Sequence, residues 1–158
     1  MENISKDLLE KLVRQIIEEK LAGVSGSNDT VDFVRTKDKS GIMSVKLPTV
    51  KVDESNRMDT GKAGDVVYTK DLFTLEESPR LGAGIMEMKE TTFTWTLNYD
   101  EVGYVIDGHL NILIDGRTVE VGPGELYLVP KGSTIEFSVP EYARYLYVTY
   151  PADWADQA

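Results

Sequence analysis

Few residues in this sequence could do chemistry, and this scarcity narrows the reactions open to it. The 158-residue chain has no cysteine and a single histidine, His109. Disulfides, thiolate metal sites and a cysteine nucleophile are therefore excluded, and no histidine-based metal site can form within one chain. His109 follows an Asp107-Gly108 turn at the start of a predicted strand. It is either a general base in a pocket, as isomerase chemistry would need, or an exposed edge-strand histidine.

Two short segments set a lysine among small residues, as phosphate-binding loops do. Thr60-Gly61-Lys62-Ala63-Gly64 lacks the Gly-x-x-x-x-Gly-Lys-Ser/Thr spacing of a nucleotide-binding loop, and a surface turn is the other interpretation. Lys131-Gly132-Ser133 offers an ammonium and backbone N–H groups, or it is an ordinary connection between strands. Neither segment alone predicts phosphate binding.

The charge of the chain excludes several partner classes. The formal net charge is -10, so nucleic acid and anionic membrane surfaces are poor partners, and phosphorylated substrates would need a cation such as Mg²⁺. No apolar run is long enough to cross a bilayer, and the N-terminus lacks the apolar centre of a signal peptide. We therefore expect a soluble, cytoplasmic protein.

Hydrophobic periodicity divides the chain into three parts. Over residues 1–22, apolar residues recur at spacings of three and four, which predicts an amphipathic helix. Residues 23–42 begin with a Gly/Ser-rich run and form a linker or irregular segment, and residues 43–158 form the β domain. A lone helix of this length is marginal, so it should dock on its own barrel, on a sister subunit or on another protein.

After the linker, short β-type runs alternate with turn signals. Asp-Gly pairs at 107–108 and 115–116 are typical of hairpin turns. Many short antiparallel strands predict an all-β sandwich or jelly-roll barrel. The predicted strands are Met43–Val45, Val66–Thr69, Gly84–Lys89, Thr92–Leu97, Gly103–Ile106, His109–Ile114, Arg117–Val121, Leu126–Val129, Thr134–Val139 and Arg144–Tyr150.

The order and spacing of the residues after position 100 resemble the two sequence blocks of the cupin superfamily. Glu101 and Gly108 match the glutamate and closing glycine of the first block, and Gly124-x5-Pro130-x-Gly132 matches the second. The resemblance implies a cupin jelly-roll barrel. If four residues separate the second histidine position of the first block from Glu101, the two metal-binding histidine positions of that block fall on Thr94 and Thr96. The histidine position of the second block falls on Ile135.

Replacing three imidazoles by two hydroxyls and an alkyl group removes the ligands that transition metals prefer. We therefore expect no tight transition-metal site, and at most Mg²⁺ held weakly through water at Glu101. Glu101 is either a catalytic carboxylate or a barrel-rim group hydrogen-bonded to Thr94 or Thr96. The other predicted pocket residues are the aromatic wall candidates Trp95, Tyr104, Tyr127 and Tyr147 and the same-face pair Glu87 and Lys89, while Glu136 should face away.

Longer strings after residue 56 resemble one cupin family, EutQ, the ethanolamine-utilisation protein Q. They are Arg57-Met58-Asp59-Thr60-Gly61, Phe93-x-Trp95-Thr96-Leu97-x-Tyr99-Asp100-Glu101, Pro130-Lys131-Gly132-Ser133 and Pro151-Ala152-Asp153-Trp154. The resemblance implies a place in a bacterial microcompartment and acetate kinase activity, with phosphate passing between Mg-ATP and acetate. The alternative is a non-catalytic cupin that bridges cargo and shell or binds a small ligand.

The resemblance also gives the N-terminal segment a role. A terminal amphipathic helix joined by a Gly/Ser linker has the form of an encapsulation peptide, whose apolar stripe would dock on shell or cargo proteins. Cupins frequently form dimers, so a homodimer is also expected.

Overall fold

The structure is a computed structural model that describes residues 13–14 and 31–155. Nearly all of the predicted helix over residues 1–22, and the first part of the linker, therefore lie outside the described residues. The chain divides into two compact units, Met1–Thr49 and Val50–Ala158. No helix in the described ranges is long and apolar enough to span a bilayer.

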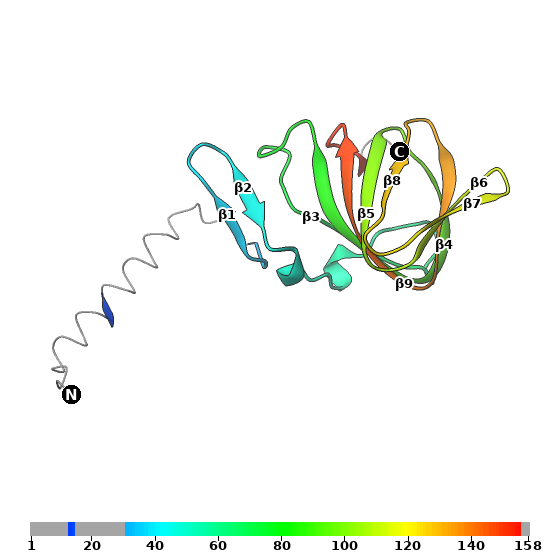
Figure 1. Cartoon of the computed structure of the whole chain (residues 1–158), viewed down its shortest axis with the longest axis horizontal. Helices are drawn as coiled ribbons and strands as arrows, with labels where there is room; N and C mark the ends of the chain where they lie inside the picture. Colours follow the sequence, from blue (N-terminus) through cyan, green and yellow to red (C-terminus); the bar gives the residue numbers. More distant parts are fainter. Residues whose placement is uncertain (1–12, 15–30, 156–158) are drawn as a thin grey trace. The chain divides into compact units, whose positions relative to one another are not determined.

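The described secondary structure is almost entirely β, which confirms the predicted all-β class (Figure 1). The strands and the two short 3-10 helices (η) are β1 (Arg35–Lys37), β2 (Met43–Val45), η1 (Leu47–Thr49), η2 (Glu54–Asn56), β3 (Val66–Asp71), β4 (Gly82–Thr96), β5 (Asp100–Gly108), β6 (Leu110–Ile114), β7 (Arg117–Val121), β8 (Leu126–Val129) and β9 (Thr134–Tyr150).

The first unit contains a small hairpin. Strands β1 and β2 pair antiparallel, and Gly41 closes their turn with a positive φ of 91°. The side chain of Thr49 then accepts a hydrogen bond from the backbone N–H of Val34 at 2.9 Å. The sequence predicts that the barrel domain begins with β2, at residue 43. Among the described residues β2 pairs with β1 and with no barrel strand, so the boundary lies after Thr49 and the first barrel strand is β3.

The second unit is a seven-stranded jelly roll built around two long strands. Its strand order is β3-β4-β9-β5-β8, with β6 joined to β9 and β7 joined to β6. Strand β9 pairs with β5 through its C-terminal half and with β6 through its N-terminal half. A register shift between Lys89 and Thr91, where Glu90 has a φ of 45°, lets β4 bend without ending. Strands β4 and β9 therefore each span two of the shorter strands predicted from the sequence.

Only one of the two predicted Asp-Gly hairpins is a hairpin. Asp115 and Gly116 have positive φ values of 49° and 72° and connect β6 to β7. Gly108 also has a positive φ, but β5 and β6 do not pair with each other. There the chain passes from the C-terminal half of β9, which pairs with β5, to its N-terminal half, which pairs with β6. A Cβ on Gly108 would lie 2.0 Å from the carbonyl oxygen of Tyr142.

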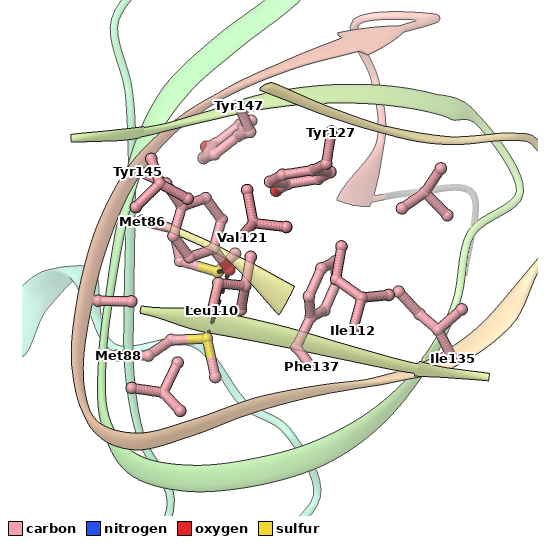
Figure 2. Packing of buried hydrophobic residues seen from close by; sticks show 14 of the residues in the cluster. Met86, Met88, Leu110, Ile112, Val121, Tyr127, Ile135, Phe137, Tyr145 and Tyr147 are labelled. Carbon is pink, nitrogen blue, oxygen red and sulfur yellow. Dashed lines mark hydrogen bonds between the residues drawn. The ribbon is translucent and has the colours of Figure 1, made fainter. Parts of the chain in front are cut away.

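The inward faces of the strands form one hydrophobic cluster. Figure 2 shows the rings of Tyr127, Tyr145 and Tyr147 inside the barrel beside Met86 and Phe137. All three tyrosines are at most 5% exposed. Met86, Phe137 and Tyr147 of this cluster also line the candidate site.

Candidate functional site

The cavity that contains Glu101 lies in the barrel interior, and its walls are almost entirely apolar or aromatic. The free space admits the centre of a water-sized sphere over only about 10 Å³, which is room for roughly one water molecule. Its lining residues are Met58, Met86, Phe93, Trp95, Tyr99, Glu101, Phe137, Tyr147 and Trp154. Glu101 is the single residue of this lining that can carry a charge near neutral pH.

Glu101 lies at this cavity with little access to water. It is 4% exposed, and its Oε1 accepts a hydrogen bond from the hydroxyl of Tyr127 at 2.8 Å. Burial raises the pKa of Glu101 from 4.5 to about 7, although the hydrogen bond from Tyr127 opposes this shift. The carboxyl group can therefore exchange a proton near neutral pH.

Aromatic side chains surround the rest of the cavity and hold one another in place. The indole N–H of Trp95 donates to the hydroxyl of Tyr99 at 2.9 Å. Trp154 packs edge to face against Trp95, Tyr99 and Tyr147, with ring centroids 6.5, 6.1 and 5.8 Å apart. Burial, and then the charge of Glu101, raise the pKa of Tyr99, so its hydroxyl stays neutral.

A second carboxylate fixes two of the lining rings. Asp71, exposed at the end of β3, accepts a hydrogen bond from the Tyr147 hydroxyl at 2.7 Å. The indole N–H of Trp154 lies 3.5 Å from the same oxygen. Asp71 thus positions cavity residues from the protein surface.

Strand register explains how the sequence aims these groups. Glu101 on β5 pairs with Val129 on β8 and Thr149 on β9, while Gly103 pairs with Tyr127. A Cβ on Gly103 would lie 2.1 Å from the Tyr127 ring, so glycine is needed for the ring to lie on β5 with its hydroxyl at Glu101. The hydroxyl of Thr149 is buried without a hydrogen-bond partner among the described residues.

The structure places Thr94 and Thr96 differently from expectation. Both are exposed, and the Thr96 hydroxyl bonds to that of Thr134 at 2.9 Å across the outer face of the sheet. The inward residues of this part of β4 and the following loop are Trp95 and Leu97. If three residues instead of four separate the second histidine position from Glu101, the two cupin histidine positions fall on Trp95 and Leu97. Glu101 therefore has no threonine partner.

Most of the other predicted pocket residues also lie outside the cavity. Tyr104 is 42% exposed on the outer face of β5, and Ile135 is buried in the core but does not line the cavity. Glu87 and Lys89 share the outer face of β4, where Glu87 forms an ion pair with Arg144. Trp95 does line the cavity, as do Glu101 and Tyr147. His109 is exposed and Glu136 does not line the cavity.

Backbone N–H groups in the two lysine-containing segments are used in hydrogen bonds within the fold. The backbone N–H of Lys131 donates to Asp100 at 2.9 Å, and that of Gly132 donates to the carbonyl of Leu97 at 2.7 Å. These donors fix the connection between β8 and β9 and are not free for phosphate. The backbone N–H of Gly61 donates to the Asp59 side chain at 2.8 Å, as in a surface turn.

Metal binding has little support in the described ranges. They contain no group of three His, Cys, Asp or Glu residues close enough to share a metal ion. The weak Mg²⁺ site predicted at Glu101 also fits poorly, because Mg²⁺ keeps several waters and the cavity has room for about one.

Six lining residues were not predicted from the sequence as site residues, namely Met58, Met86, Phe93, Tyr99, Phe137 and Trp154. Four of them, Met58, Phe93, Tyr99 and Trp154, belong to strings that resemble the EutQ family. That resemblance was the available signal, since hydrophobicity alone does not distinguish a cavity wall from an ordinary core.

The fold and the site together define a cupin barrel whose metal-ligand positions carry apolar side chains. A cupin domain of Cnp3 from Schizosaccharomyces pombe superposes with a TM-score of 0.56 at 16% identity, covering 77% of this chain and 88% of the other, which supports the fold alone. Residues 4–156 match the family model described as ethanolamine utilisation protein EutQ. The chain therefore belongs to the EutQ family.

Relatives of this family resemble the chain over most of its length. A Clostridioides difficile protein named acetate kinase EutQ is 73% identical over 155 residues, which cover 98% of this chain and 97% of the relative. A Salmonella typhimurium protein of the same name is 33% identical, and the match covers 95% of this chain but only 63% of that longer protein. The solved Clostridium difficile EutQ structure has a TM-score of 0.80 at 74% identity, covering 82% and 94% of the two chains.

Proposed function

We propose that this protein transfers phosphate between ATP and acetate. The observation that carries this proposal is the 73% identity, over nearly the whole of both chains, to a protein named acetate kinase EutQ. A match of this extent includes every residue that lines the cavity, from Met58 to Trp154. The chemistry would require Mg²⁺, because the acidic chain repels the phosphates of ATP.

The dimensions of the cavity suggest how the two substrates divide the site. ATP is far too large for the space beside Glu101, so in this proposal Mg-ATP binds outside the barrel mouth. The methyl group of acetate would enter among Trp95, Trp154 and Met58, with its carboxylate directed outward to the γ-phosphate. Glu101 would then lie below the acetate, and its neutral form would avoid repelling that anion.

The test is acetyl phosphate formation from ATP and acetate, trapped with hydroxylamine, by extensively purified protein. We expect activity to fall as the pH rises through about 7, because Glu101 becomes negative. Glu101→Gln should keep its activity at the higher pH. Glu120→Gln, on exposed β7, makes the same charge change away from the cavity and should retain the pH dependence.

Host kinases are the main alternative source of such activity. The variants must therefore pass through one purification protocol, and turnover must follow the protein peak. Trp154→Ala should raise the KM for acetate if acetate binds in the cavity. Equal activity and KM in all preparations would assign the turnover to a contaminant and refute the proposal.

A second function has a specific observation in its favour. No lysine, arginine or histidine lines the cavity in the described part of the chain, whereas phosphoryl transfer generally uses cationic groups. This favours a non-catalytic role in binding a small ligand or bridging cargo and shell. The absence of turnover, together with retained binding to purified shell or cargo proteins, would support this role over the enzymatic one.

The location and assembly proposals need separate experiments. We propose that residues 1–22 direct the protein into a bacterial microcompartment, and a chain lacking them should then stay outside purified shells. We also propose a homodimer through the outer face of β5 and β8, where Tyr104, Leu126 and Leu128 are 42%, 69% and 64% exposed. Leu126→Lys with Leu128→Lys should halve the mass measured by light scattering, whereas Leu81→Lys should not.

A further inference from the structure

The buried carboxylate of Glu101 has acceptor capacity that the protein does not use. An ionised carboxylate can accept hydrogen bonds at about four positions. In the described part of the chain Glu101 accepts one, from Tyr127, and forms no ion pair. Buried carboxylates in proteins are otherwise paired with cations or several donors. The open positions belong to a residue that is 4% exposed and lines the cavity.

The rings above this carboxylate are suited to a positive charge. Trp95, Tyr99 and Tyr147 all pack edge to face around Trp154, and all four rings line the cavity. The faces of such rings attract cations, most strongly where water is excluded. We propose that this cavity binds the ammonium group of a small primary amine, with the carboxylate of Glu101 as its counter-ion.

The donors and the available space select a primary amine. A primary ammonium has three N–H groups and can donate to Glu101, whereas a quaternary ammonium has none. The interior also admits only about one water-sized group, so a bulky head group does not fit. A neutral alcohol of the same size would leave Glu101 without a counter-charge.

Once Glu101 is ionised, the surrounding charges favour a cation over an anion. The lining contains no basic side chain, and the carboxylate of Asp71 contacts two of the lining rings from outside. The net charge of -10 also raises the concentration of cations near the protein, which favours cation binding.

The pH dependence follows from the groups that face Glu101. These are Tyr99, Tyr127 on β8, and Tyr145 and Tyr147 on β9, and burial raises the pKa of each, so all stay neutral at physiological pH. Strand β4 contributes only methionine and aromatic side chains to the lining, and Asp71 on β3 is the remaining carboxylate. Affinity for an ammonium should therefore rise with pH as Glu101 ionises around pH 7.

The inference goes beyond the proposed phosphotransfer and does not rest on it. Binding is measured without nucleotide, so it can succeed where turnover fails, and turnover can be present where an amine does not bind. If both hold, the amine should compete with acetate for the cavity.

Isothermal titration of the full chain with methylammonium chloride, and then with ethanolamine hydrochloride, tests the proposal. We expect saturable binding at about pH 8 that is about tenfold weaker at about pH 6, with proton release near pH 7. Ethylene glycol, tetramethylammonium chloride and sodium chloride at equal concentration should not bind. No amine binding at pH 8, or equal heats from ethylene glycol, would overturn the proposal.

Glu101→Gln removes the counter-ion with almost no change of shape and should abolish amine binding. Glu120→Gln is the matched control and should bind as the unmodified protein does. If Glu101→Gln fails to fold, the pH profile of the unmodified chain decides the question. Binding that is the same at both pH values would refute a role for Glu101.

Discussion

The barrel wall carries two carboxylates with opposite surroundings, Glu101 on its inner face and Glu87 on its outer face. Glu87 is 21% exposed and forms an ion pair with Arg144, which also donates to the carbonyl of Val50 at 2.8 Å. Glu101 is more deeply buried and, within residues 31–155, accepts from one neutral donor, Tyr127. Glu87 is therefore satisfied by the fold itself, while Glu101 imposes a cost that the fold does not offset.

This contrast shows where to look for function. A carboxylate with a built-in guanidinium partner stabilises the protein and needs no ligand. A buried carboxylate without a cation is destabilising unless it is protonated or a ligand compensates it. The sign of the stability change on neutralising each carboxylate should therefore differ.

The largest expected effect is a gain of stability in Glu101→Gln. Because the pKa of Glu101 is raised in the folded state, ionisation destabilises the fold as the pH rises from about 4.5 to about 7. This pKa shift lowers the free energy of unfolding by about 3 kcal/mol at pH 8 and by almost nothing at pH 4. Glutamine, which does not ionise, should recover that loss at pH 8. Urea unfolding of both proteins at the two pH values measures the difference.

Glu87→Gln provides the opposite control, since it should lower the free energy of unfolding at pH 8. A gain in Glu101→Gln that is equal at pH 4 and pH 8 would show that packing, and not charge, explains it.

A smaller effect should follow from Gly103→Ala, which disturbs the inner site without changing a charge. The new methyl group would lie 2.1 Å from the Tyr127 ring, so the ring must move away from Glu101. Overpacking of this kind typically costs about 1–3 kcal/mol. Thermal and urea unfolding should detect the loss, whereas Gly64→Ala, which meets nothing within 4 Å, should be nearly neutral. Equal stabilities of the two variants would contradict the close packing of the Tyr127 ring on Gly103.

The ion pair between Glu87 and Arg144 should stabilise the fold less than a fully buried ion pair would. Arg144→Met leaves Glu87 without its guanidinium and the Val50 carbonyl without its donor. Because both charged groups are partly exposed, we expect a loss of about 1–2 kcal/mol, less than the value for buried pairs. Arg117→Met breaks an ion pair with Asp115 whose side chains are 73% and 80% exposed, and unfolding should barely change. A similar loss in both would remove the distinction.

The sequence predicted the jelly roll and the position of Glu101 at its cavity, because turn residues and the cupin blocks depend on local spacing. The sequence-based prediction assigned the wrong residues to the inner face of the strand before Glu101. Choosing four intervening residues instead of three exchanged Trp95 for Thr94 and Thr96, since a shift of one residue reverses every side chain in a strand. Nothing in one sequence fixes that choice.

Other errors came from long-range packing. Trp154 reaches the cavity from beyond the end of β9, nearly sixty positions after Trp95 by number, and no local pattern predicts such a contact. Tyr104 was predicted as a wall residue, but strand register places it outside, next to Leu126. Its aromatic character did not distinguish a cavity wall from a surface.

The smallest expected effect concerns the hydrogen bond that Glu101 accepts from Tyr127. Tyr127→Phe removes the donor while keeping the ring, and the net loss should be about 1 kcal/mol at pH 8. The hydrogen bond lowers the pKa of Glu101 against the effect of burial, so its removal should move the Glu101 titration upward from about 7. Carbon-13 NMR of labelled glutamate carboxyls can follow this titration directly. An unchanged midpoint would mean that another donor stabilises the ionised carboxylate, and the contrast between Glu101 and Glu87 would then be one of degree.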